Sequence, residues 1–338
     1  MYVFDFDRLK RITDHLVSFK MAEAYSLSFH TVGAEKNSEE QIETGFQMQK
    51  TIMIISIPIC ALGLLGNGTV LWLLWHRIQK TKFTVYFLNM VVADLTVLFY
   101  YATVFILFLR AVPISLLCLH IMELTHAVGF NASTYILTAI TVERYLMIFF
   151  PVWCECNRPK HLSEIICALL WGLSCLMSLV LYFACYLQFD PALNEDHFSC
   201  GPTKMFRVIV NLLVFLPIMV FSTVVLFIRM LRTQQDTPPA KLDITIVATV
   251  LLFILFAASV RIIEIIARWV PKVHIPVVFL IFHFLDAIDS SGNPFIYLIV
   301  GYTRKEMDND SVLQTFLERA LLDEGDTAEG VTWAPGTK

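Results

Sequence analysis

Long stretches without charged side chains constrain this chain more than any other feature. About 18 apolar residues can cross the roughly 30 Å hydrocarbon core of a bilayer as a helix, because only a helix satisfies its own backbone groups there. Three stretches contain no Asp, Glu, Lys or Arg: 51–75, 165–189 and 208–228. Four more carry only isolated ionisable residues: 83–109, 111–142, 242–260 and onward, and 273–302. The sequence therefore predicts an all-α membrane protein with seven transmembrane helices.

The composition supports a membrane class and argues against nucleic acid as a partner. Of the 338 residues, 57% are hydrophobic and only 16% are charged, which is more apolar than an ordinary soluble domain. The formal net charge is −4, and Lys and Arg occur in short, dispersed clusters rather than in a basic stripe. The expected surroundings are a lipid bilayer.

The distribution of Lys and Arg predicts the orientation and three regions. Short loops on the cytoplasmic side of a membrane are enriched in these residues. The richer side holds Arg77, Lys80, Lys82, Arg158, Lys160, Arg229, Arg232, Lys241, Arg304 and Lys305. We therefore expect an extracellular N-terminal tail over 1–50, a helix bundle over 51–302, and a cytoplasmic amphipathic helix with an acidic tail over 303–338.

Short motifs occur at fixed places along the predicted helices. Glu143-Arg144-Tyr145 ends the third helix, and Asn293-Pro294-Phe295-Ile296-Tyr297 ends the seventh. Four more precede or lie between them: Gly66-Asn67, Leu88 to Asp94, Trp171 and Pro217. In this order the motifs resemble those of rhodopsin-like G-protein-coupled receptors. The resemblance implies that Glu143 restrains Arg144 at rest, and that Arg144 turns to the G protein when the sixth helix swings outward. It also implies that Asn293, Pro294 and Tyr297 act as an activation switch.

Other segments resemble the Mas and Mas-related branch of these receptors. They are Phe150 to Ser163, Cys167 to Trp171, Ser290 to Pro294 with Val300-Gly301, and Leu317 to Ala320. The resemblance implies a multi-pass receptor of the plasma membrane that carries an extracellular ligand signal to a heterotrimeric G protein. It implies no enzymatic activity and no catalytic residues.

The sixth predicted helix departs from that pattern. Ala257 stands where the wider family has a switch tryptophan, and Ser259 stands where the branch has proline. Without the carbonyl group that a proline frees, we expect a straighter helix that moves less on activation.

A set of polar residues resembles the sodium-binding cluster of the family. Its members are Asn67, Asp94, Ser133, Asp289 and Asn293. Asp289 replaces the asparagine that the family has there. Two neighbouring carboxylates cannot both ionise cheaply in a membrane, so either one keeps a proton or an allosteric sodium ion binds. The alternative is a structural hydrogen-bonded cluster without an ion. No other cofactor or metal is expected.

Ionisable residues inside a span normally face the bundle interior, where they mark functional sites. Helical spacing groups a second set toward the extracellular half: Tyr101, Glu123, His126, Phe130, Arg261, Glu264, His283 and Asp286. We interpret these residues as a ligand pocket, although some could instead neutralise one another as structural ion pairs. A pocket with charges of both signs suits a peptide or a small zwitterion better than a lipid.

Two cysteines are candidates for a disulfide on the oxidising side. Cys185 ends the fourth helix and Cys200 precedes the fifth. This arrangement resembles that of the Mas-related branch, and the resemblance implies a disulfide between them. Cys118, at the outer end of the third helix, is a rival partner for Cys200.

Four other functions compete with a signalling receptor. An opsin needs a lysine where this chain has Ala287, and His126 and His283 lack the spaced partners of a hydrolase or metal site. A transporter often contains internal repeats, which the sequence does not show. A receptor-like protein that acts by heteromerisation or scavenging stays open, because of Ser259 and the acidic tail.

Overall fold

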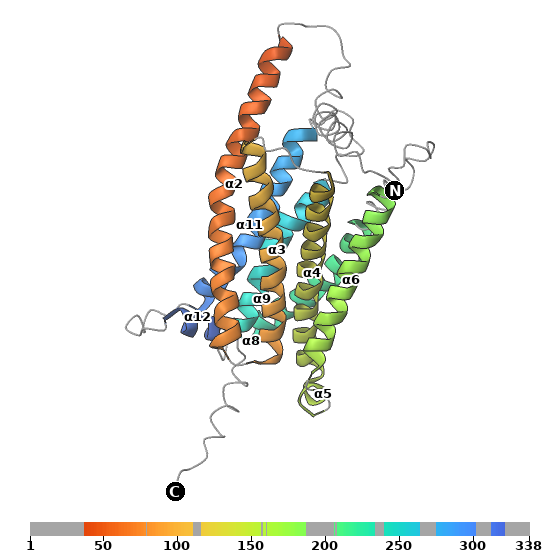
Figure 1. Ribbon diagram of the computed structural model, residues 1–338. Helices are drawn as coiled ribbons and strands as arrows, with labels where there is room; N and C mark the ends of the chain where they lie inside the picture. The colour runs from red at the N-terminus through yellow and green to blue at the C-terminus, as the bar shows by residue number, and fades with distance from the viewer. Residues whose placement is uncertain are drawn as a thin grey trace, which may run out of the picture.

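The chain folds into a bundle of long helices, which Figure 1 shows lying side by side. The computed structural model describes residues 37–78, 80–110, 116–156, 158–159, 161–186, 206, 208–233, 240–263, 275–301 and 312–321, and they contain no strand. The helices are α2 (Asn37–His76), α3 (Lys82–Arg110), α4 (Leu116–Phe149), α5 (Pro151–Cys156), α6 (Leu162–Tyr186), α8 (Leu216–Thr233), α9 (Lys241–Phe253), α11 (Ile275–Gly301) and α12 (Val312–Leu321). Two π-helical turns, η1 (Asn211–Phe215) and η2 (Ile254–Ala258), precede α8 and follow α9.

Seven helical segments have the length that a membrane span requires. Five are also apolar enough by composition: Ile54–His76, Lys82–Leu107, Leu162–Phe183, Val208–Arg232 and Lys241–Ile263. The other two, α4 and α11, have 34 and 27 residues and carry the ionisable side chains described below. At 1.5 Å per residue they are about 50 and about 40 Å long. The expected all-α bundle of seven helices is confirmed.

The outward faces of the bundle are apolar. Trp72, Leu169, Leu213 and Leu255 come from four different helical segments, and each is between 50% and 70% exposed. An apolar surface of this extent suits a lipid environment rather than water. Helix α2 begins at Asn37, well before the charge-free stretch at Thr51, and Figure 1 shows it projecting beyond its neighbours.

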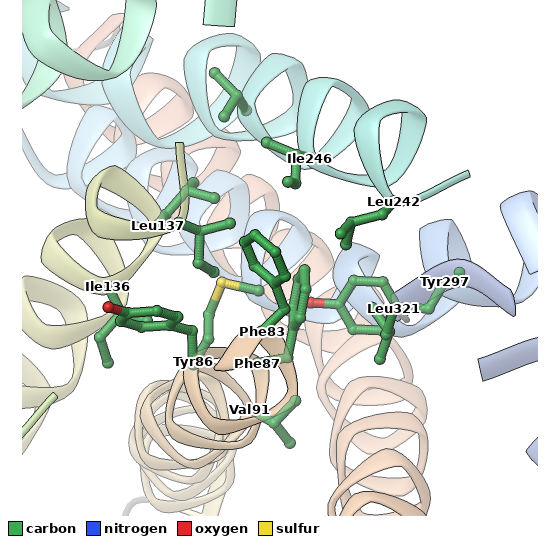
Figure 2. Packing of buried hydrophobic residues seen from close by; sticks show 14 of the residues in the cluster. Phe83, Tyr86, Phe87, Val91, Ile136, Leu137, Leu242, Ile246, Tyr297 and Leu321 are labelled. Atoms are coloured by element: carbon green, nitrogen blue, oxygen red, sulfur yellow. The ribbon is translucent and has the colours of Figure 1, made fainter. Parts of the chain in front are cut away.

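Close packing of the helices fixes their order around the bundle. Helix α2 packs against α3 and α11, α4 packs against α3, α6 and α8, and α9 packs against α8 and α11. A Cβ atom on Gly66 would lie 3.1 Å from Cβ of Pro294, so the glycine lets α2 approach α11 at the proline of the seventh helix. Figure 2 shows the apolar core near one end, where Phe83, Tyr86 and Phe87 are fully buried.

The sixth span contains an irregular turn next to Ser259, whereas the expectation of a straighter helix stays a prediction. The π-helical turn η2 interrupts the α-helical pattern directly before this residue. The Ser259 Oγ donates to the backbone carbonyls of Leu255 and Phe256, at 2.6 and 3.0 Å. A π-helical turn and a serine that bonds back to its own helix both distort the regular ladder. The irregularity that proline would supply is therefore present in another form.

Candidate functional site

Polar and charged side chains gather at three levels of the bundle. We name them the Arg144 cluster, the Asp94 cluster and the Arg261 cluster. The Arg144 cluster lies at the end of α4 and the start of α9, the Asp94 cluster lies between α3, α4 and α11, and the Arg261 cluster lies toward the other end.

The Arg144 cluster consists of two buried ion pairs. Arg144 Nε donates to Oδ1 of Asp243, the third residue of α9, and both residues are 7% exposed. Glu143 accepts one hydrogen bond from Arg158 Nε at 2.6 Å and one from the Tyr86 hydroxyl at 3.3 Å. Each buried charge therefore faces a charge of opposite sign, which offsets the cost of removing it from water. The pairs tie α4 to α9 and to the segment before α6.

The sequence identified Glu143 and Arg144 but not their partners Asp243 and Arg158. An acidic residue at the start of a predicted span was the available signal for Asp243. Tyr145, the third residue of the motif, has its ring centroid 4.6 Å from that of Phe149 and 5.8 Å from that of Phe221 in α8.

The Asp94 cluster joins α3, α4 and α11. Asp94 is 1% exposed and accepts hydrogen bonds from Ser133 Oγ at 2.9 Å and Asn293 Nδ2 at 2.8 Å. Asn67 is equally deep but bonds elsewhere, because its Nδ2 donates to the carbonyl oxygens of Gly63 and Ser290, both at 3.0 Å. It therefore connects α2 to α11 rather than to Asp94 directly.

Two amide oxygen atoms of the predicted polar cluster have no hydrogen-bond partner in the described part of the chain. Asn67 Oδ1 and Asn293 Oδ1 are buried and accept no hydrogen bond from the described residues. Asn293 also bonds Asp94 through its Nδ2, so one of these amide groups stands beside the Asp94 carboxylate, and oxygen atoms are the ligands that hard cations prefer. Asp289 lies near enough to be repelled by both Asp94 and Asp286, and no group in the described part of the chain donates a hydrogen bond to it. Burial and the neighbouring carboxylates disfavour a second negative charge at Asp289.

Tyr297, the last residue of the seventh-helix motif, is fully buried. Its ring meets Phe87 edge-on with centroids 5.5 Å apart, and its hydroxyl has no hydrogen-bond partner within the described ranges. The motif thus spans two levels, since Asn293 bonds Asp94 while Tyr297 belongs to the apolar core of Figure 2.

A chain of hydrogen bonds organises the Arg261 cluster. The Tyr101 hydroxyl donates to Asp286 Oδ2 at 3.0 Å and lies 2.8 Å from His126 Nε2. Because the hydroxyl has one proton, His126 must then donate from Nε2. Arg261 Nη2 donates to the same Asp286 oxygen at 2.7 Å. Three helical segments and α11 therefore meet at one carboxylate.

Aromatic rings surround these polar groups. The Arg261 guanidinium lies 4.2 Å from the centroid of the Phe130 ring. The His126 ring stacks on Tyr100 with centroids 4.5 Å apart, and the His126 and His283 rings are nearly parallel at 6.4 Å. Glu123 lies one turn before His126 on α4, close enough to Tyr100 to influence it electrostatically. The arrangement can pair with a ligand of either sign.

Two predicted features lie outside this geometry. Glu264, Cys200 and the side chain of Cys185 lie outside the described part of the structure, so the disulfide stays a prediction. Sequence reasoning also missed a polar connection between helices: Asn131 Nδ2 donates to Ser178 Oγ at 3.3 Å, and Asn211 Nδ2 donates to Asn131 Oδ1 at 3.1 Å.

Comparison with known proteins gives the class of this chain. Residues 66–297 match the model of the rhodopsin family of seven-transmembrane receptors. The chain belongs to this family, which comprises receptors rather than enzymes.

The relatives place it within a branch. It is 34% identical to the proto-oncogene Mas of Rattus norvegicus over 278 residues, which cover 80% of this chain and 83% of the relative. The human Mas protein is 32% identical and the match covers 92% and 93% of the two chains. The Mas-related G-protein-coupled receptor member D of Rattus norvegicus is 32% identical over 82% and 88%. The chain is a G-protein-coupled receptor of the Mas-related branch, as its motifs predicted.

Proposed function

We propose that this receptor binds an extracellular peptide or small zwitterionic ligand at the Arg261 cluster and activates a heterotrimeric G protein at the Arg144 cluster. The Arg144 end of the bundle then faces the cytoplasm of a cell whose plasma membrane the chain spans. The Lys and Arg residues of the short loops on that side support this orientation.

One observation carries the proposal: a single helical span connects the two clusters. Asp243 and Arg261 both belong to the span Lys241–Ile263, and each forms a buried ion pair with another helix. They are 18 residues apart, which corresponds to about 27 Å along a helix. A ligand that alters the Arg261–Asp286 pair therefore acts on the same helical span that holds Arg144.

The distortion in this span supports a conformational role. The turn η2 lies between the two ion pairs, and π-helical turns occur frequently at functional sites. A ligand shifts a two-state equilibrium only by its differential affinity for the two states. Rearrangement of the Arg261–Asp286 pair on one side of η2 supplies such a difference.

The charges of the Arg261 cluster support the ligand class. A ligand carboxylate would compete with Asp286 for the Arg261 fork, and a ligand ammonium group would compete with Arg261 for Asp286. The aromatic rings of Tyr100, Tyr101 and Phe130 provide apolar and cation–π contacts. An uncharged lipid would compete with neither member of this pair.

A G-protein panel tests the proposal directly. The full-length receptor is expressed with each class of G protein, and nucleotide exchange is measured without ligand and then against a peptide library. Ligand-dependent exchange that disappears in Arg144→Ala at unchanged surface expression supports the proposal. Ligand uptake without exchange on any G protein would instead identify a scavenging receptor.

A further inference from the structure

Helix α12 lies against the bundle at the Arg144 end instead of standing apart from it. Leu317, Ala320 and Leu321 are all fully buried, and no residue of 313–321 is exposed. These three residues belong to the same apolar cluster as Leu242 of α9 and Tyr297 of α11. Figure 2 shows Leu321 close to Tyr297. An isolated helix of ten residues is marginal in water, so packing against the bundle must hold it in place.

The first contact is a hydrogen bond that joins α12 to the sixth span. The Thr245 hydroxyl lies 2.9 Å from the carbonyl oxygen of Ala320, and the same hydroxyl lies 2.9 Å from the carbonyl oxygen of Lys241 in its own helix. Thr245 is two residues after Asp243, whose carboxylate holds Arg144. The hydrogen bond and the ion pair therefore restrain the same turn of α9.

The second contact is close backbone packing between α12 and the end of α11. A Cβ atom on Gly301 would overlap the carbonyl group of Phe316, at 2.5 Å from its carbon and closer to its oxygen. Only glycine permits the two backbones to approach so closely. Gln314 Nε2 adds a long contact, at 3.4 Å, to the carbonyl oxygen of Arg77 after α2.

We propose that α12 is an autoinhibitory latch, which holds the start of α9 and the end of α11 together and must leave before a cytoplasmic partner can dock. The partner is the G protein of the proposed function, so this inference rests on that proposal. Leu242, Ile246 and Tyr297, which α12 helps to bury, become available only when it moves away. Lys241 of α9 lies near enough to Arg319 of α12 for the two like charges to repel each other.

Two pairs of matched variants test the latch in the full-length receptor. Gly301→Ala places a methyl group against Phe316, whereas Gly172→Ala meets nothing within 4 Å of the new Cβ atom. Thr245→Val removes the hydroxyl that bonds Ala320. Thr249→Val makes the same change one turn later, where the buried hydroxyl has no hydrogen-bond partner among the described residues.

Two measurements distinguish the docking of α12 on the bundle from the activation of the G protein. Hydrogen–deuterium exchange of the 312–321 amides in purified receptor reports docking of α12 without any G protein. Basal nucleotide exchange on a reconstituted G protein reports its consequence. We expect Thr245→Val to accelerate both about fivefold, which corresponds to about 1 kcal/mol, a typical net hydrogen bond. Gly301→Ala should have a larger effect, and both controls should match the parent.

Unchanged amide exchange in both Gly301→Ala and Thr245→Val would overturn the latch. So would faster amide exchange with unchanged basal activity in a receptor that still responds to agonist. If amide exchange rises but neither agonist nor any variant activates a G protein, the docking of α12 stands and the proposed coupling fails.

Discussion

The two ends of the bundle hold their charges in different ways. At the Arg144 end, two ion pairs are buried against an apolar core, and each charged group has a partner from a separate segment. At the Arg261 end, one ion pair lies among histidine and tyrosine rings, and the Arg261 side chain is 16% exposed. The first arrangement suits a contact between helices in which both ion pairs break together when the helices separate. The second suits a site whose partners can be exchanged for those of a ligand.

The largest expected effect comes from removing the arginine of the first arrangement. Arg144→Ala should abolish G-protein activation while ligand affinity and surface expression persist. The measurement is agonist-stimulated nucleotide exchange in membranes with equal receptor density.

A double variant distinguishes contact with the G protein from a structural role. Arg144→Ala alone leaves Asp243 as an uncompensated buried charge, which can cost about 3–5 kcal/mol of stability. Arg144→Gln with Asp243→Asn removes both charges. Signalling that returns in the double variant would show that Arg144 only neutralises Asp243.

A variant that keeps Arg144 but removes its partner should raise G-protein activation instead of abolishing it. Asp243→Asn takes away the carboxylate that holds the arginine on α9, so basal exchange should rise about tenfold, which corresponds to about 1.4 kcal/mol. Glu164→Gln serves as the matched control, because its pairing with His161 is exposed. Basal activity equal to that of the parent would show that the pair does not restrain α9.

These contacts also show which parts of the molecule local sequence can predict. The seven spans follow from apolar length, and the bond between Asp94 and Asn293 joins two residues that the motifs had already grouped. The partners of Glu143 and Arg144 were missed. They depend on how two helices are rotated relative to each other, and the sequence of one helix alone does not determine this rotation. The docking of α12 on Thr245 joins residues 75 positions apart and has no local signal.

The irregular turn η2 illustrates a second limit. The sequence reading took the absence of proline at Ser259 to mean a straighter helix. Backbone distortion depends instead on which carbonyl groups find other partners, and Ser259 supplies them from its own side chain. The absence of proline therefore does not by itself make the backbone of this span regular.

At the Arg261 end the expected effect is smaller and its sign depends on the role of the arginine. If Arg261 binds a ligand carboxylate, Arg261→Lys should weaken binding about tenfold because the bidentate fork is lost, and Arg261→Ala should weaken it more. Asp286→Asn should then strengthen binding of an anionic ligand, because it frees the guanidinium from its partner. Equilibrium binding of the agonist from the peptide screen provides the measurement.

A structural ion pair predicts a different pattern for the same variants. Loss of either partner would lower thermal stability and surface expression together, and affinity per folded receptor would stay constant. Arg261→Asp with Asp286→Arg would restore stability in that case. Binding that recovers fully in this exchanged pair would contradict direct recognition of a ligand carboxylate by Arg261.

The smallest expected effect concerns the Asp94 cluster between the two ends. We propose that a sodium ion binds the Asp94 carboxylate together with the free oxygens of Asn67 and Asn293. The family resemblance implies that the cluster collapses on activation, so the ion should favour the resting state and lower agonist affinity a few-fold, by no more than its differential affinity for the two states. Agonist binding across sodium concentrations measures the effect.

Two variants assign the contributions of the two carboxylates. Asp94→Asn replaces the charged ligand and should remove the sodium effect. Asp289→Asn keeps every hydrogen bond of Asp94 but removes the carboxyl group whose ionised form would repel it. Because burial and the neighbouring carboxylates already disfavour a charge at Asp289, this variant should weaken the pH dependence of agonist binding and leave an ordinary sodium effect. Identical sodium curves for the parent, Asp94→Asn and Asp289→Asn would show that the cluster only connects α3, α4 and α11 through hydrogen bonds.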